Sequence, residues 1–173
     1  MLNFDISYSS RFDRKTWSVV LNCGQRITLP DGTVLGNFES GLFKDIEFEG
    51  DKLVIIQTGQ VNVTDEVANF CRSNWVPVSD IFPVMEFKGA DFYRSPRVEL
   101  GDFAFSLWYF GHNFPGSIHR EHDFYELHTV IMGKGEMQKF HEQSEGTIYE
   151  RHILAPGQTH RAFFDRSGKY PWH

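Results

Sequence analysis

The sequence predicts a mainly β protein in which several short strands form a sandwich or a closed barrel, accompanied by one short helix. Two observations lead to this fold class. Short apolar runs alternate along the chain with Pro- and Gly-containing turn signals. The 173 residues are 40% hydrophobic and 16% aromatic, which is enough to bury a core and excludes a disordered chain. This length fits one domain, or one domain with a substantial extension.

The N-terminal third contains the first strand signals. Residues 17–22 form a short apolar run, and residues 30–33 (Pro-Asp-Gly-Thr) are typical of a turn, because Pro presets φ and Gly tolerates positive φ. Residues 46–49 alternate between apolar and acidic side chains. They are followed by Gly50-Asp-Lys and the apolar residues 53–57. This order predicts a β-hairpin.

One segment has the pattern of a helix. Thr64 can cap residues 64–72, and Asp65 and Glu66 suit the positive end of a helix dipole. Residues 73–83, with prolines at both 77 and 83, are interpreted as a connector. The strand signal then returns at residues 103–110, 126–132, 135–140, 147–154 and 159–164.

Charge and cysteine content exclude several classes of protein. The net charge is −6, and no run of Lys or Arg forms a nucleic-acid-binding stripe, so we expect no nucleic-acid partner. No stretch reaches the roughly 18 apolar residues of a membrane span, and the N-terminus does not resemble a leader. Cys23 and Cys71 follow no metal or redox spacing. We therefore expect a cytoplasmic protein with reduced thiols that does not bind membranes.

Histidines and one glutamate form the candidate site. Side chains on a strand alternate between faces, so Glu126 and His128 should point the same way. His122 precedes a short turn before this strand. His160 lies 34 positions after Glu126, which leaves room for a hairpin and a return to the same wall. Imidazoles and a carboxylate bind divalent transition metals and leave positions open for substrate.

These residues resemble the paired motifs of the cupin superfamily. His122, three residues, Glu126, six residues and Gly133 resemble the first motif, and Pro156-Gly157-Gln-Thr-His160 resembles the second. The resemblance implies a cupin-type double-stranded β-helix, or jelly-roll barrel. We expect residues 85–173 to form the barrel core, and residues 1–84 to form a β-rich extension that packs on the barrel or completes it.

The same resemblance implies a metal set of His119, His122, Glu126 and His160. The first histidine of the cupin motif falls at Arg120 here, so either His119 or His128 would replace it. The metal implied is a divalent transition ion, with Fe(II) preferred and Ni, Mn and Zn as alternatives.

The resemblance also suggests roles around the metal. His128 and Tyr125 are the candidate acid/base residues. Arg120 is a candidate to bind a substrate carboxylate, and Trp108 to line the pocket. The remaining internal histidines are interpreted as exposed or hydrogen-bonded without a catalytic role, namely His112, His141 and His152.

The expected function is a metal-dependent cupin enzyme that acts on a small polar metabolite as a dioxygenase, lyase or isomerase. The segment His122-Asp-Phe-Tyr-Glu-Leu also resembles the ligand-sensing cupin domains of AraC-type regulators, so a non-catalytic sensor of a small molecule is the alternative. A metal-free epimerase or isomerase is a third possibility. Pairing of edge strands predicts a homodimer.

Overall fold

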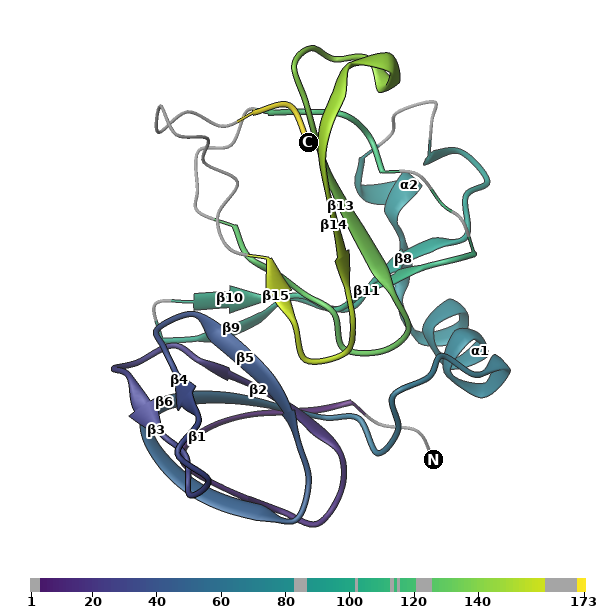
Figure 1. The fold of residues 1–173 in the computed structure, drawn as a ribbon. Helices are drawn as coiled ribbons and strands as arrows, with labels where there is room; N and C mark the ends of the chain where they lie inside the picture. The colour runs from purple at the N-terminus through teal and green to yellow at the C-terminus, as the bar shows by residue number, and fades with distance from the viewer. Residues whose placement is uncertain are drawn as a thin grey trace. The chain divides into compact units, whose positions relative to one another are not determined.

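A computed structural model describes residues 4–82, 87–101, 103–112, 114, 116–120, 126–160 and 171–173 (Figure 1). The chain forms two compact units: one contains Val63–Ser117, and the other combines Asn3–Asn62 with Ile118–His173. The predicted mainly β content is confirmed. The predicted boundary between residues 84 and 85 falls in a segment outside the described residues, so it stays a prediction.

The core of the second unit lies in a four-stranded antiparallel sheet of order β1-β6-β2-β5. Its strands are β1 (Asp5–Arg14), β2 (Ser18–Asn22), β5 (Glu39–Phe43) and β6 (Ile46–Gln57), coloured purple to blue in Figure 1. All five residues of β2 are buried, as its apolar sequence predicts. The main apolar cluster contains Phe12, Val20, Leu29, Phe48, Leu53 and Ile55.

Two turn signals in this sheet have different outcomes. The turn at residues 30–33 is confirmed: it joins β3 (Ile27–Thr28) to β4 (Val34–Leu35), and Gly32 has a φ of 85°. The predicted hairpin within residues 46–57 is wrong, because β6 is one continuous strand. Its Gly50-Asp-Lys segment instead faces the irregularity in the pairing with β1, between Ser9 and Arg11. Continuous pairing with β1 on both sides of that bulge explains why the chain does not reverse.

Two antiparallel strand pairs belong to the same unit. The first joins β12 (His128–Thr129) to β15 (Thr159–His160), and the second joins β13 (Gly135–Phe140) to β14 (Ile148–Leu154). The strands predicted over residues 135–140 and 147–154 are confirmed, but β12 is shorter than the predicted 126–132. The described strands form separate sheets and close no barrel, so the jelly roll stays a prediction.

The other unit contains two helices, α1 (Asp65–Asn74) and α2 (Val78–Ile81). The predicted first helix is confirmed, and the Thr64 hydroxyl caps it by accepting from the Val67 N–H. The single-helix expectation is wrong, because α2 lies within the predicted connector. Helix α2 is only four residues long, which is too short to leave a periodic pattern.

The predicted strand at residues 103–110 is two strands. These are β10 (Phe103–Phe105), which pairs with β9 (Val98–Leu100), and β11 (Trp108–Phe110), which pairs with β8 (Phe92–Arg94). Strand β8 also pairs with β7 (Val76–Pro77). The two halves of the aromatic run therefore belong to different sheets. No helix among the described residues has both the length and the apolar character that crossing a membrane requires.

Candidate metal centre

The pairing of β12 with β15 brings His160 next to His128. The two histidines are direct partners in the antiparallel register, as are Thr129 and Thr159 one position further along. The chain therefore returns to pair beside β12 after the β13–β14 strand pair, as the spacing between Glu126 and His160 led us to expect. Because side chains alternate, the two histidines share one face of this strand pair and the two threonines share the other.

Strand β14 adds two further polar groups. Glu150 and His152 are two residues apart on this strand, so both side chains project from the same face. The Glu150 carboxylate accepts a hydrogen bond from the Lys139 ammonium at 2.6 Å and lies 2.6 Å from His152 Nε2. Lys139 is the register partner of Glu150 on β13, which explains why the two side chains meet.

Glu150, His152 and His160 together form a cluster that could hold a metal ion. The ligand atoms that these three side chains offer all lie within 4.8 Å of one another. The rings of His152 and His160 are 5.2 Å apart and meet edge to face at 68°. Two imidazoles and one carboxylate are a ligand set for divalent transition metals, and they leave coordination positions open.

The electrostatic environment keeps these ligands in their metal-binding forms. His160 is 9% exposed, and burial lowers its pKa to about 4, with further lowering by the charges of His152 and Lys139. The imidazole is therefore neutral at neutral pH and retains a lone pair for a metal. Hydrogen bonding to Lys139, followed by that to His152, lowers the pKa of Glu150, so its carboxylate is ionised.

Glu126 and His128 form a separate pair beside the cluster. Glu126 Oε1 lies 3.1 Å from His128 Nε2, which confirms that these two side chains point the same way. A carboxylate at this distance orients the imidazole. The structure thus brings His160 together with Glu150 and His152, whereas Glu126 contacts His128.

The other predicted site residues that the structure describes have contacts outside the cluster. His119 exchanges backbone hydrogen bonds with His173, and their rings are 4.6 Å apart. The Arg120 guanidinium lies over the Trp172 ring at 4.5 Å. Trp108 is in the unit that contains Val63–Ser117, where the Arg94 guanidinium lies over its ring. His122 and Tyr125 fall outside the described residues, so their assigned roles stay predictions.

The sequence interpretation missed Glu150 and His152 as candidate ligands. It assigned His152 no role and did not consider Glu150. A signal was present, because a Glu-x-His pattern within a predicted strand places both side chains on one face. What the sequence could not supply was the packing of that face against His160, which depends on how β13–β14 lies beside β12–β15.

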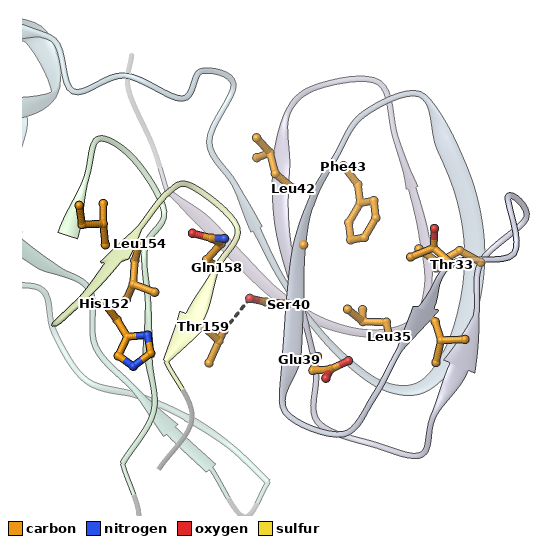
Figure 2. A pocket seen from close by; sticks show the side chains of 14 residues that line it. Thr33, Leu35, Glu39, Ser40, Leu42, Phe43, His152, Leu154, Gln158 and Thr159 are labelled. Atoms are coloured by element: carbon orange, nitrogen blue, oxygen red, sulfur yellow. Dashed lines mark hydrogen bonds between the residues drawn. The ribbon is translucent and has the colours of Figure 1, made fainter. Parts of the chain in front are cut away.

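A groove of about 550 Å³ adjoins this cluster (Figure 2). One side is formed by the turn before β4 together with β4 and β5, and the other by the end of β14, the turn before β15 and the start of β15. The Ser40 hydroxyl bridges the two sides: it donates to the Gly157 carbonyl at 2.7 Å and lies 2.5 Å from the Thr159 hydroxyl. His152 lines the groove and also belongs to the cluster, so the two features adjoin.

Comparison of the chain with protein families, curated proteins and solved structures finds no match.

Proposed function

We propose that this protein is a metal-dependent enzyme of the cupin type that acts on a small metabolite. The observation that carries the proposal is the convergence of Glu150, His152 and His160 within 4.8 Å. Fe(II) is the proposed ion, with Ni, Mn and Zn as alternatives, because two imidazoles and one carboxylate are a ligand set shared by these metals. The jelly-roll barrel and the homodimer are parts of the same proposal.

The donor atoms present fit such an ion. His160 is neutral because of burial, Glu150 is ionised, and the half-exposed His152 leaves a side from which substrate can approach. A divalent ion held there would act as a Lewis acid on a substrate oxygen. The three protein ligands leave that oxygen a coordination position.

The proposed acid/base residue is His128. Its Nε2 is held by Glu126, and its backbone is paired with that of His160, so it sits at the edge of the proposed centre. An imidazole can act as a general base that accepts a substrate proton, and the Glu126 carboxylate holds this one in place. Tyr125 is proposed as a second acid/base group from the resemblance alone.

One observation favours a metal-free alternative. Lys139 already compensates the Glu150 carboxylate at 2.6 Å, and its side chain is only 14% exposed. A cluster that is neutralised in this way can serve as a polar binding site without a metal. That arrangement suits the sensing module or the metal-free isomerase that the sequence also suggested.

Metal analysis of protein purified without an affinity tag separates these functions. We expect near-stoichiometric transition metal in the wild-type protein and loss of that metal in His152→Ala, because this substitution removes one of three ligands. His141→Ala is the matched control: His141 lies just after β13 and stacks on Tyr149, away from the cluster.

Two further measurements complete the test. Titration of metal-depleted protein with Fe(II), Mn(II), Ni(II) and Zn(II) should show one saturable site, weakened by His152→Ala and unchanged by His141→Ala. Circular dichroism checks that both variants fold. A folded wild-type protein that binds none of these ions would contradict the proposal and favour the metal-free function.

A further inference from the structure

We infer that the substrate is amphipathic: an anionic oxygen group binds at the metal centre, and a neutral, largely apolar side chain occupies the adjoining groove. This inference rests on the proposed function, because it identifies the class of substrate for the same site. The sequence suggested only a small polar metabolite. The groove points to a molecule with two chemically different ends.

The first support is continuity between groove and cluster. His152 lines the groove and contributes to the candidate metal cluster, so the two features share this side chain. Figure 2 shows His152, Leu154 and Thr159 on one side of the groove, and Ser40 and Leu42 on the other. A volume of about 550 Å³ lies within the range of small-molecule sites, about 300–1,000 Å³.

The second support is the lining of the groove. Seven of its fourteen residues are large apolar side chains: Leu29, Val34, Leu35, Leu42, Phe43, Ile153 and Leu154. Several polar groups among the others already have partners. The Ser40 and Thr159 hydroxyls form a hydrogen bond with each other, and the Thr159 hydroxyl also lies 2.6 Å from the Thr129 hydroxyl. The side-chain carbonyl of Gln158 accepts a hydrogen bond from the Ala155 N–H. The surface left for a ligand is therefore mainly apolar.

The third support is the distribution of charge. No Lys or Arg occurs among the described lining residues, and Glu39, which accepts from the Gly36 N–H, is their only carboxylate. An anionic group inside the groove would have no cationic partner and would be repelled by Glu39. At the cluster, the Lys139 ammonium supplies positive charge, and a divalent ion bound there would add to it. The anionic end of the substrate therefore belongs at the centre and the neutral end in the groove.

A series of straight-chain monocarboxylates, from acetate to decanoate, tests this inference. Affinities are measured by calorimetry on the full chain, once loaded with the metal that it retains and once metal-depleted. Each buried methylene contributes about 0.8 kcal/mol, so we expect affinity to rise by up to about fourfold per carbon until the groove is filled. The affinity for acetate measures binding at the head-group site alone, because acetate has no chain that could occupy the groove.

Val34→Phe provides the matched perturbation. Val34 lines the groove on the short strand β4, and a larger side chain there fills part of the volume. We expect this variant to bind acetate normally but to lose the gain with chain length. Val63→Phe, at a position 45% exposed in the other unit, should retain the wild-type slope. Thermal unfolding shows that both variants are folded.

The outcomes separate the groove from the metal. If affinity still rises with chain length in metal-depleted protein, and this rise disappears in Val34→Phe, the groove is supported as the site of the apolar end. That result would count against the metal-dependent function. If acetate binds only in the presence of metal, and affinity does not rise with chain length, the inference of an amphipathic substrate is overturned. The proposed function would remain intact. A slope that Val34→Phe does not change, or the absence of any carboxylate binding, also overturns the inference.

Discussion

The four-stranded sheet and the histidine-bearing strand pairs, β12–β15 and β13–β14, differ in the groups that surround their buried polar side chains. In the sheet, Asn22 is completely buried, and its amide donates to the main-chain carbonyls of Gln25, Leu35 and Gly36 while accepting from the Gly24 N–H. In the strand pairs, the nearly buried His160 lies instead among other ionisable side chains, His152, Lys139 and His128.

This difference distinguishes a region that stabilises the fold from a region that could bind an ion or a ligand. A buried amide saturated by backbone groups fixes the local chain path and offers nothing to a ligand. In the strand pairs, burial lowers the pKa of His160, and ionisable groups held near one another can exchange protons or bind ions. The sheet accordingly has long, well-paired strands, whereas β12 and β15 have only two residues each. The predictions below test this division, beginning with the largest effect.

Phe12→Ala should have the largest effect on stability and none on the proposed metal site. Phe12 is fully buried and stacks on Phe48 with ring centroids 5.1 Å apart. Removing the ring leaves a cavity, so we expect a loss of about 3–5 kcal/mol in the free energy of unfolding. Denaturant unfolding measures the loss. Tyr8→Ala, at a site 44% exposed on the same strand, should cost about 1 kcal/mol or less.

The division is contradicted if Phe12→Ala, while still folded, also loses its metal. Metal content per folded molecule is the deciding quantity, since a merely less stable protein should keep the wild-type stoichiometry.

Gly157→Ala tests the contact between the two regions. Gly157 has a φ of +86°, and an added Cβ would lie 2.5 Å from the Leu42 backbone nitrogen. Left-handed backbone alone costs about 1–2 kcal/mol for a residue with a side chain, and the clash adds to this. We expect about 2 kcal/mol or more in lost stability, measured by thermal unfolding. Gly146→Ala is the control, because no atom lies closer than 4.0 Å to a Cβ there.

The sequence predicted the elements with strong local signals. The apolar run of β2, the capped helix α1 and the turn before β4 all follow from residues close together in the chain. It failed where tertiary pairing overrode a local signal. Gly50 has the composition of a turn, yet pairing with β1 on both sides keeps β6 continuous. Likewise, the aromatic run 103–110 divides because its halves pair with different strands.

The candidate site was predictable in part for the same reason. The shared face of Glu126 and His128 is a local consequence of strand alternation, and the return of His160 follows from the spacing. The participation of His152 depends on the packing of one strand pair beside another, which no local pattern encodes. A motif indicates which residues carry chemistry, but only the packing shows which of them meet.

Asp91→Asn examines a charged network outside the histidine cluster. Arg72 donates two hydrogen bonds to this carboxylate, at 2.8 and 2.6 Å, and the pairing lowers the pKa of Asp91. The folded pKa lies below the unfolded one, so the stabilisation is present above the unfolded value and is lost as the pH falls through the folded value. We expect the variant to be less stable than wild type at neutral pH.

The stability difference should shrink in acid, as followed by denaturant unfolding across the acidic range. Glu99→Gln is the control, because Glu99 forms an exposed pair with Arg97 and should give little difference at any pH. A difference for Asp91→Asn that stays constant with pH would show that the carboxylate acts through packing or hydrogen bonding alone.

Lys139→Met has the smallest expected effect and bears most directly on the candidate centre. The Lys139 ammonium bonds Glu150 and adds positive charge beside His160, so in metal-depleted protein it competes with a cation for the carboxylate. Removing that charge should tighten metal binding by a few-fold to about tenfold, the scale of about 1 kcal/mol expected for partly screened charges. Lys134→Met, an exposed residue in the turn before β13, should leave affinity unchanged. Weaker binding in Lys139→Met would show that the lysine positions Glu150 for the metal. Unchanged binding would place the ion away from Glu150. The charged groups of the histidine-bearing strand pairs would then have a structural role, as the buried polar group of the sheet does.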